Sequence, residues 1–329
     1  IDLAKNVIHV HGINRAGKTT FNRQLRREQF LRFMQQQEPV DVGMEACGGS
    51  HHWARLLQAQ GHQVNLYPAQ HVKAFLLGSK NDQNDARAIA EARTRANIPT
   101  VAIKSEHQLA MLSLHRSRAL LVKQKTQLAN CIRGLLTEFG VVFPQREKAF
   151  REGVAEFLGN GHPQGYLMSS ISTLYQQWKQ IGEQIEVLTR DMNQVARTDE
   201  VAKRLQGVPG VGPISATAFV STVGDAGHFK NARQLAAWLG LVPKQYSTGG
   251  KTTLMGITKR GDRYLRYLLV HGARAALKVA EKSNDPRMKW ALDVAKRRGQ
   301  NRAVVALANK NARVMWALMK HEDNYRCAA

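Results

Sequence analysis

The pattern of apolar and polar residues divides the chain into three parts. In residues 1–104, short apolar runs alternate with amphipathic stretches. The runs predict strands, because alternate side chains of a strand face opposite sides; they are VIHVHGI (7–13), VDVGMEA (40–46) and QVNLYPA (63–69). Helices are predicted over residues 27–37, 51–60 and 84–96, the last opened by an Asn or Asp cap. This part therefore reads as an α/β domain.

Residues 105–200 have the pattern of long helices. In one stretch the apolar positions alternate steps of four and three over about four heptads, namely at Leu167, Ile171, Leu174, Trp178, Ile181, Ile185, Leu188, Met192 and Val195. An earlier series repeats every seven residues at Leu114, Leu121, Leu128 and Leu135, and GNGHPQG (159–165) separates the two. The pattern fits an antiparallel hairpin within one chain and equally an arm through which chains dimerise.

Residues 201–329 are predicted to form a basic, mostly helical domain that ends in a long amphipathic helix at 301–319. The chain of 329 residues has a net charge of +23, and this last part, with 23 basic and 7 acidic side chains, carries +16 of it. Such an excess indicates a polyanionic partner. Nucleic acid is favoured over membrane headgroups, because no basic amphipathic segment with exposed large apolar residues stands out.

The remaining global features favour a soluble cytoplasmic protein. No apolar run is long enough to span a bilayer, so no membrane partner is expected. Cys47, Cys131 and Cys327 are isolated and odd in number, which favours a reducing compartment over a disulfide framework. The chain begins at Ile1, without methionine and inside an expected strand, so further residues are expected to precede it.

Four carboxylates in the first part are candidates for a metal site. Asp2 lies on the expected first strand, Glu45 ends a buried strand, and Asp82 and Asp85 lie three residues apart at a helix start, on one helical face. Acids placed in this way can hold two divalent ions for phosphoryl transfer, and hard oxygen ligands suit Mg²⁺ or Mn²⁺. Alternatively, Asp82 and Asp85 are ordinary first-turn acids that the helix dipole favours.

The segment GVPGVGPISA (207–216) is predicted to be a helix-hairpin-helix. Gly210 and Gly212 permit a tight turn, and Pro213 suits the first turn of the next helix. Backbone N–H groups in such a turn can contact nucleic-acid phosphates without reading sequence. The alternative is a plain connection between two helices.

The segment QYSTGGKTTLMGITKRGDRYLRYLL (245–269) combines a serine, two glycines and a basic helix expected to be capped by Asp262. Gly249 and Gly250 give flexibility, and the cations that can track phosphates are Lys251, Lys259, Arg260, Arg263, Arg266, Arg274 and Lys278. Ser247 beside a phosphate is placed as a nucleophile would be; a turn serine is the alternative. No His or Asp stands at triad spacing, so an acyl-transfer hydrolase fits poorly.

Together, IDLAK, MEACGGSHHW, KNDQNDARAIA, GVPGVGPISA and YSTGGKTTLMGITKRGDRYLRYLLVHGARA resemble the DEDD-type transposases of the IS-one-ten class of insertion sequences. The resemblance spans residue 1 to about 320, with the motifs in the expected order. It implies a RuvC-like domain of RNase H fold at 1–104, a helical coiled-coil domain at 105–200 and a transposase domain with a helix-hairpin-helix and a catalytic serine at 201–329.

The same resemblance implies site residues and partners. Asp2, Glu45, Asp82 and Asp85 would be the DEDD acids, and Ser247 the nucleophile, although many relatives have two serines where this chain has Ser247 and Thr248. It further implies donor and target DNA, a structured bridge RNA as guide, a bacterial, nucleoid-associated location, and a tetramer whose active sites combine acids from one subunit with serine from another.

Two other functions compete with an RNA-guided DNA recombinase. One is a hydrolytic junction endonuclease of RuvC type, in which water is the nucleophile and Ser247 is structural. The other is a nucleic-acid-binding protein without catalysis, whose acids are structural. A covalent protein–DNA adduct separates the first rival from the recombinase, and strand joining that needs a divalent ion excludes the second.

Overall fold

The computed structural model describes residues 1–76, 81–95, 97–161 and 164–327. Its contacts group the chain into two compact units, Ile1–Glu106 and His107–Ala329. The second unit holds both the predicted helical part and the predicted basic part, so the boundary at residue 200 stays a prediction. The end of the helix predicted to reach residue 96, and residues 162–163 of the predicted break, lie outside the described residues.

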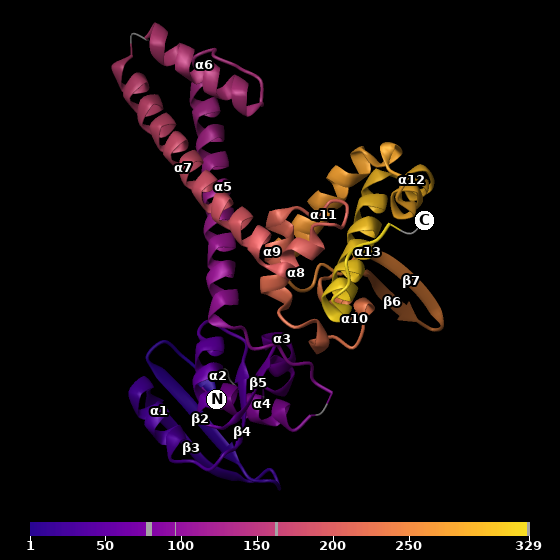
Figure 1. Cartoon of the computed structure of the whole chain (residues 1–329). Coiled ribbons are helices and arrows are strands. Elements are labelled where there is room, and N and C mark those ends of the chain that lie inside the picture. Colours follow the sequence, from indigo (N-terminus) through magenta and orange to yellow (C-terminus); the bar gives the residue numbers. More distant parts are fainter. Residues whose placement is uncertain (77–80, 96, 162–163, 328–329) are drawn as a thin grey trace. The chain divides into compact units, whose positions relative to one another are not determined.

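The first unit contains a three-stranded sheet and a two-stranded sheet (Figure 1). β1 (Asp2–Leu3), β2 (Val7–Ile13) and β3 (Thr19–Arg26) are antiparallel, and β4 (Asp41–Glu45) pairs in parallel with β5 (Gln63–Tyr67). The backbone nitrogen of Ile1 donates to Gly43 O at 2.9 Å, which sets the β1 end beside β4. The three-stranded sheet, in the order β1-β2-β3, thus meets the two-stranded sheet of β4 and β5 at β1.

The helices of this unit are α1 (Arg27–Gln35), α2 (Ser50–Ala59), the single turns α3 (Ala69–Val72) and η1 (Lys73–Phe75), and α4 (Asp82–Arg93). α4 packs against β2, β1 and β4, and Ile8, Met44 and Leu66 are fully buried in the core. The predicted strands and helices are present, and the α/β character of this unit is confirmed. β3 was not predicted, because its sequence TTFNRQLR is polar and largely exposed.

The second unit begins with three long helices, α5 (Glu106–Thr137), α6 (Glu147–Asn160) and α7 (Gly165–Thr198). The heptad positions of α7 pack within the chain, in a cluster that joins Ile171 and Trp178 to Ile132 of α5 and Phe150 of α6. Between α5 and α7, Arg118 Nε donates to Thr189 Oγ1 at 2.8 Å, and Lys125 Nζ lies 4.5 Å from the Trp178 ring. The seam thus forms a hairpin within one chain.

The rest of the second unit is a helical bundle around one core, in which Phe219, Leu265 and Leu307 are fully buried. Its helices are α8 (Glu200–Leu205), α9 (Pro213–Val223), η2 (Ala226–His228), α10 (Ala232–Trp238), α11 (Arg263–Lys278), η3 (Ala280–Lys282), α12 (Pro286–Arg298) and α13 (Gln300–His321). The predicted cap is confirmed, because Asp262 Oδ1 accepts from Leu265 N at 2.6 Å. No helix among the described residues is long and apolar enough to cross a bilayer.

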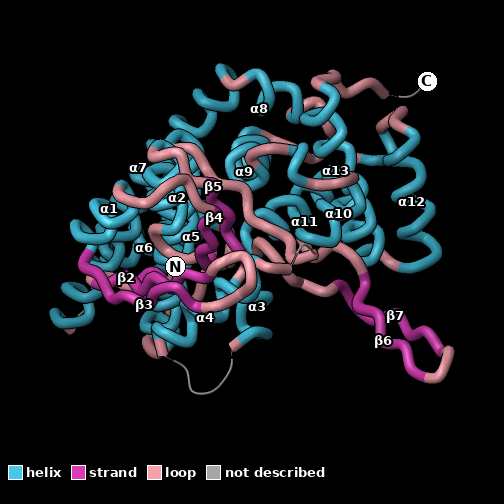
Figure 2. The backbone as a smooth tube through the Cα atoms, turned by 90° about the horizontal axis from the view of Figure 1, so that it is seen from below, coloured by secondary structure: helices cyan, strands magenta, loops and turns pink. Residues whose placement is uncertain are grey.

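The segment expected to be a flexible loop is instead a β-hairpin that extends from the bundle (Figure 2). β6 (Pro243–Thr248) and β7 (Lys251–Ile257) are antiparallel, and Gly249 and Gly250 form the turn with φ of +55° and +78°. Two successive residues with positive φ match the twist of the flanking strands, which explains the glycine pair. The glycines therefore close a defined turn rather than free a hinge.

Candidate active site and nucleic-acid surface

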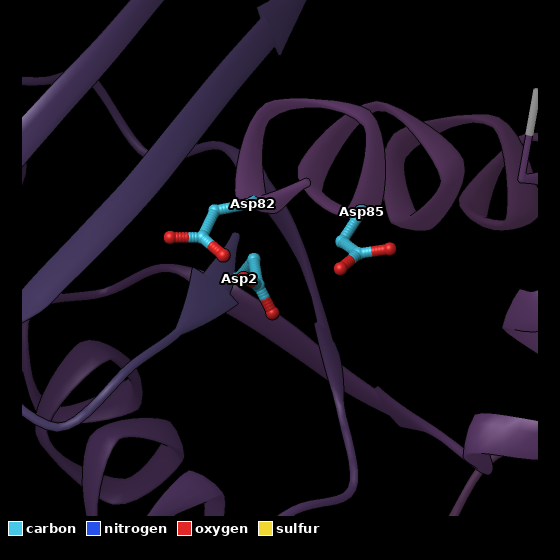
Figure 3. Close-up of side chains that lie close together, drawn as sticks. All are labelled: Asp2, Asp82 and Asp85. Carbon is cyan, nitrogen blue, oxygen red and sulfur yellow. The ribbon is translucent and has the colours of Figure 1, made fainter. Parts of the chain in front are cut away.

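Three of the four predicted acids meet at one end of the sheet (Figure 3). Asp2 lies on β1, and Asp82 and Asp85 lie in the first turn of α4. An oxygen of each carboxylate lies within 4.8 Å of an oxygen of the others. Asn81 caps α4 by accepting a hydrogen bond from Asn84 N at 2.8 Å, which starts the helix where both of its acids face β1.

The electrostatics of this acidic cluster fit a divalent cation. Burial raises the pKa of Asp2, and the charges of Asp85 and Asp82 raise it further. The three carboxylates thus repel one another, and a bound cation would relieve that repulsion. Among the described residues, the three ligand atoms that lie within 4.8 Å of one another are all carboxylate oxygens, which Mg²⁺ or Mn²⁺ prefers.

Glu45 is placed close by but outside this cluster. It ends β4, the strand next to β1, and its carboxylate is not among those that lie within 4.8 Å of one another. Burial raises the pKa of the Cys47 thiol, and the charges of Glu45 and then Asp2 raise it further, so both acids act on the same neighbour. Glu45 therefore borders the three-acid cluster.

The structure adds His9, which the sequence analysis did not single out. It lies opposite Asp2 in the β1–β2 register, and its Nε2 is 3.3 Å from Asp82 Oδ2. The signal was present in VIHVHGI, where strand alternation turns His9 away from the buried Ile8 and Val10. His9 thus links the strand acid to the helix acids.

Ser247 lies on β6, directly opposite Thr252 of β7. Its Oγ accepts a hydrogen bond from Gln245 Nε2 at 2.8 Å and donates one to Thr252 Oγ1 at 3.3 Å. The whole of β6 is exposed. The hydroxyl is therefore held in a defined orientation and is open to a large substrate.

The predicted phosphate-binding cations differ in their surroundings. Lys251, Lys259, Arg260, Arg263 and Arg274 are exposed, and Arg274 Nη2 donates to Asn301 Oδ1 at 3.3 Å. Arg266 is half-buried, and its Nη1 donates to Leu239 O and to Arg260 O, each at 2.9 Å. Arg266 therefore ties the end of the hairpin to the bundle, in addition to any contact with phosphate.

The two glycines of the predicted helix-hairpin-helix also have different roles. Gly210 has a φ of +85°, and a Cβ there would come within 2.4 Å of Gly272 O on α11, so it allows two backbones to pack together. Gly212 faces open space at the N-cap of α9, and Pro213 begins that helix as predicted. Of the two, only Gly212 has open space around it in the part of the chain that the structure describes.

Comparison with known proteins identifies the family. A model of a DEDD-type transposase domain, described as Transposase, matches residues 1–141, and the model described as Transposase IS116/IS110/IS902 family matches residues 202–289. A probable family 20 transposase of Pseudomonas aeruginosa is 44% identical over 99% of this chain and 97% of its own length. The transposase for insertion sequence element IS1111A of Coxiella burnetii is 40% identical over 100% and 91%.

A third relative, the transposase for insertion sequence element IS1328 of Yersinia enterocolitica, is 38% identical over 97% of this chain and 95% of its own length. These relatives match the chain over nearly its whole length. The chain therefore belongs to the IS116/IS110/IS902 family of transposases, which are enzymes that cleave and rejoin DNA. A DEDD domain also implies dependence on a divalent metal.

Proposed function

We propose that this insertion-sequence transposase joins DNA through a covalent phosphoserine intermediate on Ser247, with Mg²⁺ or Mn²⁺ held by the acidic cluster. The observation that carries the proposal is the convergence of Asp2, Asp82 and Asp85, with oxygens within 4.8 Å of one another. Glu45, at the end of the neighbouring strand, would complete the set of ligands. The antiparallel sheet β1-β2-β3, the parallel pair β4-β5 beside β1, and α4 packed against β1, β2 and β4 support a RuvC-like unit of RNase H fold.

The metal and the serine have separate tasks in this proposal. When bound, the divalent ion would stabilise the negative charge that develops on the phosphate oxygens. The cluster and Ser247 belong to different compact units, Ile1–Glu106 and His107–Ala329. This division is compatible with active sites assembled from acids of one subunit and the serine of another, in a dimer or tetramer.

Ser247 has the surroundings of an activated hydroxyl. In the proposed step its Oγ bonds to phosphorus, the bond from phosphorus to one deoxyribose oxygen breaks, and the serine proton passes to that leaving oxygen. Gln245 Nε2 donates to the serine Oγ and can stabilise the charge that grows there. Thr252 Oγ1 accepts the serine hydrogen bond and so fixes the direction of the hydroxyl proton.

Nucleic acid is the proposed partner of the basic part. Residues 201–329 carry a net charge of +16, and Lys251, Lys259, Arg260, Arg263 and Arg274 are exposed there. The proposed partners are donor DNA, target DNA and a structured bridge RNA that selects them. The RNA rests on the resemblance of the motifs and on this charge, which suits any polynucleotide.

Trapping the covalent intermediate tests this proposal. Labelled DNA is incubated with the protein and Mg²⁺, then run on a denaturing gel before and after protease treatment. Wild type should give a shifted, protease-sensitive band, and Ser247→Ala should give none while still binding DNA and RNA. Thr248→Ala, which removes the adjacent hydroxyl of the same strand, is the matched control and should keep the band.

Two results would overturn the serine mechanism. A band that survives in Ser247→Ala places the nucleophile elsewhere. Cleavage by wild type without any adduct indicates water as the nucleophile, as in a hydrolytic RuvC-type endonuclease. RNA that co-purifies with the wild-type protein, identified by sequencing, tests the guide RNA separately.

A further inference from the structure

A groove of about 1120 Å³ lies between β7 of the serine hairpin and helices α12 and α13. Its wall on the hairpin side includes Leu254 and Met255, which are 64% and 59% exposed. Trp290 and Val294 of α12 line the opposite side. Exposed apolar side chains grouped in a concavity mark a binding surface rather than ordinary protein surface.

The charge of this groove is of one sign. Four cationic side chains line it, Arg298, Arg302, Lys310 and Arg313, and no acidic side chain lines it in the part of the chain that the structure describes. Lys310 Nζ lies 4.1 Å from the centroid of the Trp290 ring. Burial lowers the pKa of Lys310, and the charges of Arg287 and Arg313 lower it further. The charged form of Lys310 is therefore disfavoured, and an anion bound here would stabilise it.

The groove adjoins the proposed nucleophile. Ser247 pairs with Thr252, and Leu254 follows two residues later on the same strand, about 7 Å along it. A DNA strand whose phosphate lies at Ser247 therefore reaches the groove within its next nucleotides. Figure 2 shows that β6 and β7 extend together from the helices, so the hairpin is accessible to such a strand.

We propose that this groove holds an unpaired strand of the DNA substrate beside the site of cleavage. Proteins hold single-stranded nucleic acid with apolar and aromatic side chains flanked by cations: the bases stack on aromatic rings and the cations contact the phosphates. Here Trp290, Leu254 and Met255 are the apolar side chains, and Arg298, Arg302, Lys310 and Arg313 are the cations. The bases of a duplex are stacked on one another and could not stack on Trp290. A second copy of the chain is disfavoured as occupant, because the chain carries a net charge of +23.

This inference rests on the proposed function only in naming the strand as the substrate's, so its test avoids catalysis. The full chain is titrated, without divalent ions, into a labelled single-stranded DNA about 12 nucleotides long, and binding is followed by fluorescence anisotropy. Loss of the stacking surface in Trp290→Ala should weaken binding about tenfold or more. Binding of a duplex of the same sequence should change less than about twofold.

The cation rim is tested with variants that leave the core untouched. Arg298→Gln and Arg302→Gln should each weaken single-strand binding and reduce the slope of log K against log salt by about 0.7. Arg297 is the matched control, since it lies on the same exposed helix end but does not line the groove. Arg297→Gln should keep single-strand binding within about twofold of wild type.

The outcomes separate this inference from the serine mechanism. The proposal that the groove binds single-stranded DNA is wrong if Trp290→Ala weakens single-strand and duplex binding equally. It is also wrong if Arg298→Gln and Arg302→Gln leave single-strand binding unchanged. A Trp290-dependent preference of about tenfold or more for RNA of the same sequence assigns the groove to RNA instead. A change of particle mass in these variants, without loss of DNA binding, would make it a protein interface. Ser247→Ala should bind the single strand as wild type does, whatever the adduct assay shows.

Discussion

His9 Nε2 lies 3.3 Å from Asp82 Oδ2, and His9 faces Asp2 across the β1–β2 register. The imidazole is largely enclosed, with its side chain 14% exposed, whereas the Asp82 side chain is 55% exposed. A strand residue thus contacts the exposed carboxylate at the start of α4. We expect His9 to orient Asp82 toward the other acids.

Replacing His9 should weaken metal binding without unfolding the unit. His9→Ala leaves Asp82 free to rotate away, and loss of such a supporting contact costs about 10- to 100-fold in metal affinity. The measurement is the rise of the melting temperature with Mg²⁺ concentration, from which the dissociation constant of each variant is obtained. His9→Gln, which keeps a side-chain hydrogen-bond donor, should recover much of the affinity. Equal Mg²⁺ dissociation constants for wild type and His9→Ala would remove His9 from the site.

The acidic cluster should matter for chemistry more than for folding. Asp82→Asn and Asp85→Asn should abolish strand joining and the stabilisation by Mg²⁺, which for wild type reaches about 2.7 kcal/mol at a hundredfold excess over Kd. Nucleic-acid binding should persist, because a basic protein loses negative charge. Joining assays, thermal melts and DNA binding provide the readouts.

Glu91→Gln is the matched control for these variants. Glu91 lies on the same helix and pairs with Arg95 at 2.7 Å on the surface, away from the cluster. Removing an exposed pair of this kind costs about 0.5 kcal/mol, so joining should stay near the wild-type rate. Joining at the wild-type rate in Asp82→Asn or Asp85→Asn would refute the metal site.

The helical hairpin offers a test that separates folding from assembly. Ile171 is fully buried between α7 and its neighbours, so Ile171→Lys should lower the free energy of unfolding by more than about 3 kcal/mol. Leu120 and Val187 are 55% and 46% exposed on α5 and α7. If the hairpin also joins chains, Leu120→Lys and Val187→Lys should reduce the particle mass in light scattering while melting stays near wild type. An unchanged mass would exclude these exposed positions as the interface.

His115 should make the second unit less stable in mild acid. It is buried between α5, α9 and α11, where its ring nitrogens lie 3.2 Å from Tyr264 Oη and 3.1 Å from Thr217 Oγ1. Burial, and then the charge of Arg118, lowers the pKa of His115 from 6.5 to about 4. Between these two pH values His115 is protonated in the unfolded chain but neutral in the folded one. The contribution of His115 to the free energy of unfolding is therefore complete above pH 6.5 and falls by about 3 kcal/mol as the pH drops to 4.

Denaturant unfolding between these two pH values checks this prediction. His115→Phe removes the titrating group and should show a shallower dependence of unfolding free energy on pH than wild type. His107→Gln, which removes an exposed imidazole from the same helix, is the matched control. The same pH slope in wild type and His115→Phe would assign the acid sensitivity to other groups.

Several features followed from local pattern alone. The strand at 7–13, the short strand that contains Glu45, the cap at Asp262 and the heptads of α7 are each encoded by neighbours in sequence, through alternation, helical spacing or a single capping side chain. Asp82 and Asp85 could be placed on one helical face for the same reason. Sequence patterns predict these features because the interactions that determine each of them join residues only a few positions apart.

Other features depended on contacts between distant segments. Asp2 meets α4 because α4 packs against β1, and His9 enters the site through register with Asp2. Arg266 looks like any other helix cation in sequence, yet folding brings Leu239 O and Arg260 O to its Nη1. β3 was hidden because its exposed residues carry no apolar alternation.

The sequence by itself determined the chemistry that this protein carries: the acids, the serine, the glycines and the basic charge of the last part. The tertiary structure decided how these groups are used. It brought three acids within 4.8 Å of one another, left Glu45 at their border, and turned the expected loop into a hairpin that presents Ser247 beside an apolar, cationic groove. The reason is that proximity and burial depend on long-range packing, which local residue patterns do not specify.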